Sequence, residues 1–544
     1  MAPEVLQNSL HNVSAHLRLR AEEFPERKAI CMPDGSSISF AELEARCDAL
    51  AHGLLSSGLR PGDRVCLFVR PGADLIALTH GMFRAGLIPV LIDPGMGRKG
   101  LLSCVERVAA RGLVGIPRAQ VARLLFPLAF ASIEVVVTVG PRLAWGGASL
   151  AKLERLGKSK GAFPIRTEGP ETPAAVLFTS GSTGPAKGVL YNHGNFIAQL
   201  EALKSLYQLK PGDVDVACFP LFALFDNALG MTSVFPDMDP SRPAACDPAK
   251  IYQAIEEQGA SFSFGSPAIW KRLLPWCQAE GKRFSTLKRL TIAGAPVAPQ
   301  LVEGLRALLP EGGDVHTPYG ATESLPVSSA SGEEITGELR AGIEGGQGTC
   351  VGRPAENIEL CLVRISDDEL PPFSQELLVA EGEVGEVCVR GRVATEGYLH
   401  DALATRRAKI QDPTGAWHRM GDLGKLDAEG RLWLQGRKSH RIQSAEGLVL
   451  PVPVENIYLN LPGVRRAALV GTGAAGAELP LLIIEPEDGV DRELLKRSVL
   501  GHRRELPATS VVTRVRFHDD FPVDVRHNAK IKREVLKRWA EAQA

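Results

Sequence analysis

The sequence predicts an α/β protein, with a large N-terminal domain of layered sheets and helices and a small α+β domain at the C-terminus. Three observations predict this fold class: a length of 544 residues, alternation of strand-like and helix-like segments, and a change of pattern near residue 436. A chain this long exceeds what one compact core accommodates, so at least two domains are expected. Strand–helix alternation is typical of mainly parallel sheets covered by helices.

The N-terminal part carries most of this alternation. Short apolar or β-branched runs predict strands at residues 64–69, 87–92, 135–139 and 174–178. Apolar residues at helical spacing predict helices at residues 3–24, 40–55 and 75–85. The Gly- and Glu-rich piece at residues 331–348 is expected to be a surface loop.

The C-terminal part has a different pattern. It predicts short strands at residues 466–471, 479–484 and 511–517 and helices at residues 491–505 and 530–542. The basic run at residues 437–441 looks exposed and is the best linker candidate. We therefore predict an N-terminal domain at residues 1–436, a linker at 437–441 and a C-terminal domain at 442–544.

Composition limits the class of function. The chain holds 62 Lys and Arg against 63 Asp and Glu, and this balance predicts no nucleic-acid partner. Ten cysteines occur without a Cys-x-x-Cys pair, as expected for reduced thiols. Its most apolar run, Leu124–Val139, is interrupted by Pro127 and Glu134, and no basic segment followed by an apolar core opens the chain. We expect a soluble, cytoplasmic protein with no secretory signal and no transmembrane segment.

A loop after the expected strand at 174–178 has the chemistry of a phosphate-binding site. Its hydroxyl and glycine positions, followed by a lysine, are Thr179, Ser180, Gly181, Ser182, Thr183, Gly184 and Lys187. Glycines let backbone N–H groups turn inward toward phosphate oxygens, and the lysine adds positive charge. The alternative, a merely flexible Gly/Ser turn, explains the unbroken run less well. Because Gly188 follows Lys187, this is not the P-loop of nucleoside triphosphatases.

Four further segments with candidate binding or catalytic residues follow along the chain. They are Ala293-Gly-Ala-Pro296, Tyr319-Gly-Ala-Thr-Glu-Ser324, Trp417-His-Arg-Met-Gly-Asp422 with Gly436-Arg437, and Pro522-Val-Asp-Val-Arg-His-Asn-Ala-Lys530. Taken alone, each segment could also be explained without a function, as the exit of a strand, a turn, a solvated Asp or a solvated Lys. Together with the loop they resemble the adenylate-forming superfamily of acyl-CoA synthetases, peptide-synthetase adenylation domains and beetle luciferases, over about residues 20–540. The resemblance implies that the C-terminal domain is a lid that rotates about the hinge at 437–441.

The resemblance also implies roles for individual residues. Tyr319 stacks on adenine, Thr322 meets the α-phosphate, and Glu323 with Thr183 holds Mg²⁺, which suits oxygen ligands. Asp422 accepts hydrogen bonds from the ribose hydroxyls, with Arg437 beside it. Other implied nucleotide contacts are Gly294, Ala295, Pro296, Gly320, Ala321 and Leu434. Lys530, rather than nearby Lys532, bridges the substrate carboxylate and α-phosphate, and the implied catalytic set is Lys530, Glu323, Thr183 and Lys187.

Several positions depart from the pattern of thioester-forming relatives. Ser439 stands where the hinge Asp is usual, Gln443 replaces a Lys, and Glu446 replaces a Gly of the pantetheine channel. In Phe219-Pro-Leu-Phe-Ala-Leu-Phe225 a usual His is Ala223. This combination is similar to the β-lactone synthetases of bacterial long-chain olefin biosynthesis, as are the segments 92–99, 219–230 and 235–243.

The most specific expectation is therefore an ATP- and Mg²⁺-dependent enzyme that adenylates a long-chain 2-alkyl-3-hydroxy fatty acid and closes it to a β-lactone. The resemblance also implies assembly with other olefin-biosynthesis enzymes. Two alternatives stay open: a long-chain fatty acyl-CoA synthetase, and a non-catalytic nucleotide-binding protein. Candidates for the acyl pocket, which are equally explained as core packing, are Leu221, Phe222, Ala223, Leu224, Phe225 and Met231.

Overall fold

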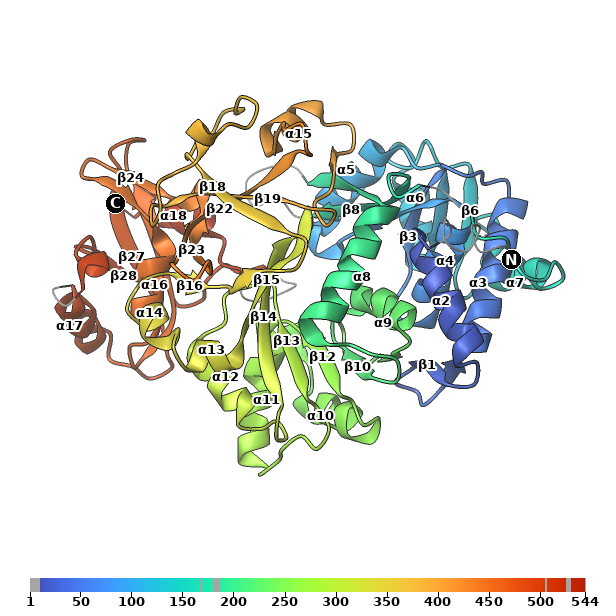
Figure 1. Ribbon diagram of the computed structural model, residues 1–544, viewed down its shortest axis with the longest axis horizontal. Coiled ribbons are helices and arrows are strands. Elements are labelled where there is room, and N and C mark those ends of the chain that lie inside the picture. Colours follow the sequence, from blue (N-terminus) through green and yellow to red (C-terminus); the bar gives the residue numbers. More distant parts are fainter. Residues whose placement is uncertain (1–9, 167–168, 180–185, 504–505, 525–529, 544) are drawn as a thin grey trace.

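The computed structural model describes residues 10–166, 169–179, 186–503, 506–524 and 530–543. Two large sheets, a smaller sheet and a C-terminal α+β unit lie along the long axis (Figure 1). N-terminal elements form one end and C-terminal elements the other. This arrangement confirms the predicted α/β fold class.

One large sheet has eight strands and carries the loop with phosphate-binding chemistry. In spatial order the strands are β20 (Gly397–Tyr398), β9 (Lys187–Asn192), β8 (Pro173–Thr179), β4 (Ile88–Ile92), β3 (Arg64–Phe68), β5 (Gly112–Gly115), β6 (Val135–Thr138) and β7 (Ala148–Ser149). Strands β8, β4, β3, β5, β6 and β7 are parallel neighbours, and β9 and β20 are added antiparallel at the edge. Parallel strands end at the same edge of a sheet, so Thr179 at the end of β8 lies at that edge.

The other large sheet has nine strands. Its spatial order is β17 (Arg353–Pro354), β15 (Ser324–Ser331), β14 (Asp314–Ala321), β13 (Arg289–Ile292), β12 (Phe262–Gly265), β10 (Val214–Ala217), β11 (Thr232–Val234), β1 (Lys28–Cys31) and β2 (Ser37–Ser39). The strands from β14 to β1 are parallel, whereas β14 and β15 form an antiparallel hairpin. Only residues 322 and 323 separate the two strands of this hairpin.

Helices cover the two large sheets, as parallel sheets require. In chain order they are α2 (Val13–Glu23), α3 (Phe40–Ser56), α4 (Ala73–Arg84), α5 (Gly97–Val108), α6 (Pro117–Leu125), α7 (Leu150–Lys158), α8 (His193–Tyr207), α9 (Ala223–Leu229), α10 (Pro248–Glu257), α11 (Pro267–Ala279), α12 (Pro299–Arg306), α13 (Gly332–Thr336) and α14 (Arg340–Glu344).

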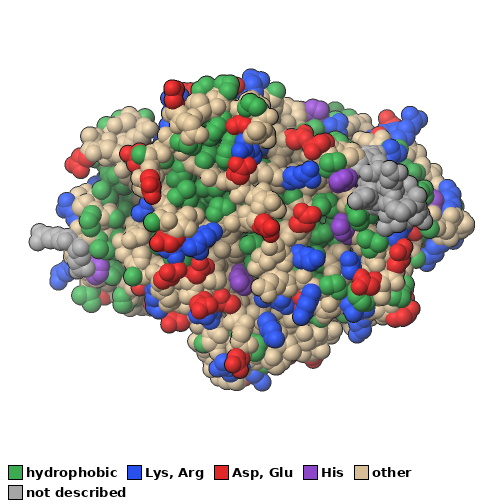
Figure 2. Space-filling view, viewed as in Figure 1, with side chains coloured by type: hydrophobic (Ala, Val, Ile, Leu, Met, Phe, Trp, Pro, Cys, Tyr) green, Lys and Arg blue, Asp and Glu red, His purple; other side chains and the backbone are tan. Residues whose placement is uncertain are grey.

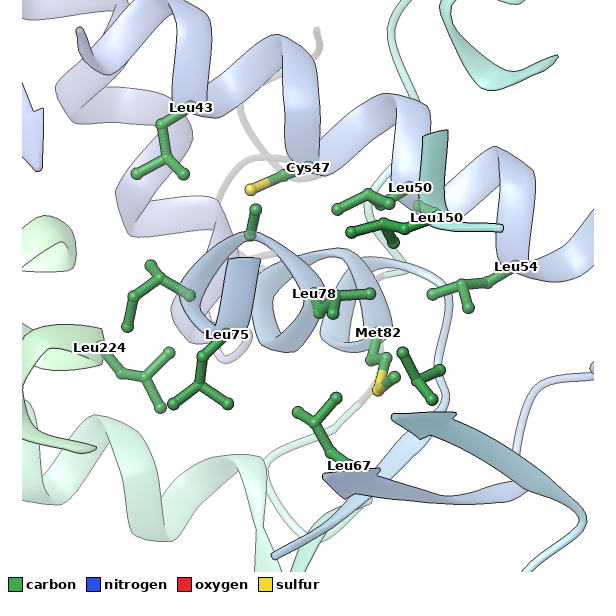
Figure 3. Packing of buried hydrophobic residues seen from close by; sticks show 14 of the residues in the cluster. Leu43, Cys47, Leu50, Leu54, Leu67, Leu75, Leu78, Met82, Leu150 and Leu224 are labelled. Carbon is green, nitrogen blue, oxygen red and sulfur yellow. The ribbon is translucent and has the colours of Figure 1, made fainter. Parts of the chain in front are cut away.

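The largest core cluster lies where α3 and α4 pack together. Figure 3 shows Cys47 and Leu50 of α3 turned toward Leu78 of α4, all of them fully buried. Helix α7 lies just as close to α3, because a Cβ on Gly157 would fall 1.8 Å from the carbonyl oxygen of Ala49. Glycine at that position therefore permits an approach that no other residue would allow.

The third sheet and the C-terminal unit follow. The sheet contains β16 (Thr349–Cys350), β23 (Leu432–Arg437), β22 (Trp417–Leu426), β19 (Gly385–Arg390) and β18 (Glu359–Val363), and β21 (Lys409–Ile410), which follows α15 (Ala402–Ala408), pairs with β22. The C-terminal unit contains β24 (Ile442–Ser444), β25 (Gly447–Val449), α16 (Pro451–Leu459), β26 (Val464–Thr472), β27 (Leu479–Pro486), α17 (Arg492–His502), β28 (Val515–Phe517) and α18 (Arg533–Glu541). The predicted domain bounds at 436 and 441 stay predictions.

Three sequence expectations were wrong in detail. Residues 331–348 are not a loop, because Ser331 and Glu334 form a capping box that starts α13, and α14 follows. The helix expected at 3–24 is not continuous, because residues 10–12 are not helical and α2 starts at Val13, where the side chain of Asn12 caps it; residues 3–9 lie outside the described part of the chain. The basic run 437–441 is mostly half-buried, and Lys438 donates to the buried carboxylate of Glu386 at 2.9 Å.

The molecular surface agrees with the balanced composition. Figure 2 shows acidic and basic side chains interspersed over the face in view. No helix in the described part of the chain is long and apolar enough to cross a membrane. All ten cysteines are free thiols, and only Cys361 is not fully buried.

Candidate active site

The loop with phosphate-binding chemistry joins β8 to β9. Thr179 ends β8 and pairs across the hairpin with Lys187, which starts β9. The predicted contacts Ser180, Gly181, Ser182, Thr183 and Gly184 lie outside the described residues. The structure therefore fixes the two ends of the loop, with the half-buried Lys187 at its exit.

Lys187 and Glu323 meet at the ring of Tyr398. Strand β20 pairs with β9, which places Tyr398 opposite Val189. The Lys187 Nζ lies 4.7 Å from the centroid of the Tyr398 ring, and the Tyr398 hydroxyl donates to Glu323 Oε1 at 2.8 Å. Burial and the nearby Glu323 carboxylate raise the pKa of Tyr398, so this hydroxyl stays a proton donor.

Backbone contacts hold the turn that presents Thr322 and Glu323. The Tyr191 hydroxyl donates to the carbonyl oxygen of Thr322. The backbone N–H of Thr395 donates to the carbonyl oxygen of Glu323 at 2.8 Å. A two-residue turn fixed from both sides keeps the Glu323 carboxylate at one place, which a site for a cation or phosphate requires.

A second cluster joins Tyr319, Asp422 and Arg437. The Tyr319 hydroxyl donates to Asp422 Oδ2 at 2.7 Å, and Arg437 Nε lies 3.0 Å from Asp422 Oδ1. Asp422 on β22 and Arg437 on β23 are direct cross-strand partners. Burial and the Asp422 charge raise the pKa of Tyr319, and Asp422 raises the pKa of Arg437. Each carboxylate oxygen still has a lone pair for a ribose hydroxyl.

The remaining predicted nucleotide contacts border these clusters. Gly294, Ala295 and Pro296 follow the carboxyl end of β13, and Gly294 has φ of 100°, which favours glycine. Gly320 and Ala321 end β14 beside Thr322. The side chain of Leu434 packs against the same core cluster as Tyr319. These positions are consistent with an adenine and ribose site, whose contacts stay predictions.

Sequence patterns did not reveal three polar residues near Glu323 and Lys187. They are Tyr398, Lys409 and His418. The buried ammonium of Lys409 donates to the carbonyl oxygen of Thr395, and burial lowers the pKa of Lys409 to about 8. Burial and the charge of Lys409 lower the pKa of His418, so its imidazole is neutral. The pairing of β20 with β9 joins residues far apart in the sequence. The segment Thr395-Glu-Gly-Tyr398 by itself therefore does not indicate that Tyr398 lies near Lys187.

Lys530 lies in the C-terminal unit, on the turn before α18. Its side chain is exposed, its N–H donates to Asp524 Oδ1 at 2.9 Å, and its carbonyl oxygen accepts from the Asp524 N–H. These backbone contacts stay within the C-terminal unit. The residues at 525–529 lie outside the described part of the chain, so the approach of Lys530 to Glu323 stays a prediction.

The candidate acyl-pocket residues divide between two core clusters. Leu221, Ala223 and Leu224 pack with the α3–α4 cluster. Phe222, Phe225 and Met231 pack with a second cluster that includes Phe264. Phe222 stacks on Phe264 with ring centroids 4.1 Å apart. The contacts show core packing at each position, and a substrate-lining role for the half-buried Leu221 and Phe222 stays a prediction.

The chain matches the family described as AMP-binding enzyme over residues 17–399, and it belongs to that family. It is therefore an AMP-forming, carboxylate-activating ligase, and the resemblance read from its motifs is confirmed. The chain is 42% identical over 549 residues to the olefin beta-lactone synthetase of Stenotrophomonas maltophilia, with 98% of both chains covered. It is 42% identical over 556 residues to the olefin beta-lactone synthetase of Xanthomonas campestris pv. campestris, again with 98% of both covered.

A solved structure supports the same fold. The amide bond synthetase McbA from Marinactinospora thermotolerans is 25% identical and superposes with a TM-score of 0.79. The match covers 97% of this chain and 99% of that one. Both the large N-terminal part and the C-terminal unit therefore have counterparts in an enzyme of known structure.

Proposed function

We propose that this chain activates a long-chain 2-alkyl-3-hydroxy fatty acid with ATP and closes it to a β-lactone, as in bacterial olefin biosynthesis. The observation that carries the proposal is the full-length identity of 42% to two olefin beta-lactone synthetases. The clusters around Glu323 and Asp422 supply the adenylation half of this chemistry.

In the first step a carboxylate oxygen of the acid attacks the α-phosphorus, and the bond to pyrophosphate breaks. Lys187 faces the phosphates with its ammonium, and Asp422 with Arg437 orients the ribose. Lys530 brings a positive charge to the carboxylate and α-phosphate when the C-terminal unit closes. These fixed charges favour the transition state because they are in place before charge develops.

In the second step the 3-hydroxyl oxygen attacks the acyl carbon, AMP leaves and the hydroxyl proton is released. Intramolecular attack needs no external acceptor, because the nucleophile is already held beside the acyl carbon. Positions that a thioester-forming enzyme uses are altered here. Gln443 and Glu446 lie exposed on the β24–β25 hairpin, and Ala223 is fully buried.

The donor set also fits Mg²⁺. A hard cation takes carboxylate and phosphate oxygens and usually keeps several waters, so one protein carboxylate is enough. Glu323, with Oε1 already oriented by Tyr398, is that carboxylate in our proposal, together with Thr183. When bound, the cation would neutralise charge on the departing pyrophosphate. We further propose that the protein works in the cytoplasm, assembled with enzymes that supply the hydroxy acid and consume the lactone.

A comparison of two acids with and without CoA tests the reaction. The enzyme is given ATP, Mg²⁺ and either a 2-alkyl-3-hydroxy acid or the same acid without its hydroxyl. We expect both acids to form an adenylate and only the hydroxy acid to give lactone, with CoA making no difference. An absolute requirement for CoA, or a thioester as the main product, would instead support an acyl-CoA synthetase.

A further inference from the structure

Helix α6 turns apolar side chains to the outside of the molecule. Val121, Leu124 and Leu125 of α6 and Leu128 just after it are 45%, 55%, 68% and 87% exposed. Leucine and valine are normally among the most buried residue types, so four such exposed side chains within eight positions are unusual. Contiguous exposed apolar surface on a folded protein marks a contact with another molecule or a membrane. We call these four residues the α6 apolar face.

The segment around the α6 apolar face is rich in basic residues. Residues 94–131 contain six Lys or Arg and one acidic residue, and two of the six are paired with acidic residues elsewhere: Arg107 with Asp401, and Arg111 with Asp63 and Glu134. Arg98 and Lys99 at the start of α5 and Arg118 at the start of α6 are all exposed. The Arg98 guanidinium lies 5.9 Å from the ring centroid of Phe126, which joins the start of α5 to the end of α6.

Helix α5 is hydrogen-bonded to the β8–β9 hairpin, which carries the loop with phosphate-binding chemistry. Arg107 of α5 donates through Nη1 to the carbonyl oxygen of Ala186 at 2.6 Å. Ala186 directly precedes Lys187. The helix that carries Arg98 and Lys99 is thus held to the exit of the loop between β8 and β9, so a surface bound there lies near the candidate active site.

We propose that the α6 apolar face and its basic border dock the protein on the surface of an anionic lipid membrane. Leucines enter the interface between headgroups and acyl chains, while Arg and Lys at the border attract anionic headgroups. An anionic lipid surface fits this face better than a protein partner, because the exposed Arg98, Lys99 and Arg118 carry charge of one sign that a layer of anionic headgroups matches. The inference does not depend on which acid the enzyme activates.

Vesicle sedimentation with the full-length protein tests the proposal. The probes are vesicles of phosphatidylcholine alone and of phosphatidylcholine with phosphatidylglycerol. We expect binding to the anionic vesicles, weaker binding at high salt and little binding to the neutral vesicles. The double variant Leu125→Ser, Leu128→Ser should lose at least about 10-fold in vesicle affinity, since it removes the two most exposed side chains of the face.

The matched control is the double variant Leu479→Ser, Leu494→Ser. These leucines are 57% and 67% exposed but lie in the C-terminal unit, away from α5 and α6. We expect the control variant to sediment like the wild type, and both variants to keep wild-type thermal unfolding and ATP–pyrophosphate exchange with a short, water-soluble acid. Equal vesicle binding by all three proteins would overturn the proposal. A second result would also overturn it: none of the proteins binds vesicles, and the wild type forms a dimer that the Leu125→Ser, Leu128→Ser variant does not form. In that case a second copy of the chain would cover the face.

Discussion

Lys530 and Lys532 are two positions apart, and only one of them is expected to act on the substrate. Both side chains are exposed in this structure. Lys532 is held by its backbone, whose N–H donates to the carbonyl oxygen of Pro522 at 2.8 Å, directly before α18. Sequence resemblance places the charge that meets the α-phosphate on Lys530.

We predict that Lys530→Ala lowers the rate of acyl-adenylate formation by about 100-fold or more, the size expected when a preorganised charge at the transition state is removed. Lys532→Ala is the matched control and should stay within a few-fold of the wild type. The measurement is ATP–pyrophosphate exchange at saturating acid. If only Lys532→Ala lost activity, the role would belong to Lys532. Two fully active variants would contradict a catalytic role for either lysine.

Tyr398 offers a second test at the level of one atom. Tyr398→Phe removes the hydroxyl that donates to Glu323 but keeps the ring beneath the Lys187 ammonium. Hydrogen bonds to charged groups contribute about 1.5–3 kcal/mol, so kcat/KM for ATP should fall roughly 10- to 100-fold. A control, Tyr252→Phe, removes a hydroxyl that donates to the carbonyl oxygen of Arg283 outside the candidate site. Equal kinetics for both variants would contradict the role of Tyr398.

At the scale of elements, β10 and α9 each bury a carboxyl group, Asp215 and Asp226, close enough to influence each other's titration. Burial and the neighbouring Asp226 raise the pKa of Asp215, and burial raises the pKa of Asp226 to about 7. The Ser233 hydroxyl of β11 donates to Asp226 at 2.9 Å. A carboxyl group whose pKa is higher in the folded than in the unfolded chain stabilises the fold. This stabilisation is complete at pH values below the pKa of the unfolded chain. That stabilisation is lost as pH rises through the folded pKa.

We therefore predict that the free energy of unfolding falls between about pH 4 and pH 7 because of this pair. Asp226→Asn cannot lose a proton, so its unfolding free energy should depend less on pH over the same range. Urea unfolding of wild type and variant at a series of pH values measures the difference. Parallel pH profiles for the two proteins would contradict Asp226 as a source of the pH dependence.

The elements also show what sequence patterns can and cannot predict. The expected strand at 64–69 is β3 at 64–68, and the expected helix at 40–55 is α3 at 40–56, because period and length are local properties. Strand β20 has only two residues and forms by pairing with β9 far along the chain, so no periodicity reveals it. The same limit hid Tyr398 and Lys409, whereas Glu323 and Asp422 were predicted because they lie within family motifs.

At the scale of the whole molecule, two basic residues of the predicted linker at 437–441 form ion pairs of very different burial. Glu386 accepts from Arg419 at 2.6 Å and from Lys438 at 2.9 Å, and the Arg419 and Glu386 side chains are almost fully buried. Arg441 pairs with Asp367, a side chain that is 67% exposed. Lys438 is thus tied to the N-terminal part, so a rotation of the C-terminal unit would begin after it, at the exposed Ser439.

We predict that Glu386→Gln destabilises the protein by about 3–5 kcal/mol, because it leaves the buried Arg419 and the Lys438 ammonium without a compensating charge. Asp367→Asn, which removes the partner of Arg441 on the same predicted linker, is the matched control and should change stability by less than about 1 kcal/mol, as exposed pairs do. Urea unfolding gives both values. Glu386 lies outside the candidate site, so acyl-adenylate formation at low temperature should persist in folded Glu386→Gln. Similar stability losses for the two variants would show that burial does not decide the strength of these ion pairs. If Glu386→Gln were as stable as the wild type, Lys438 would not be the residue that fixes the linker to the N-terminal part.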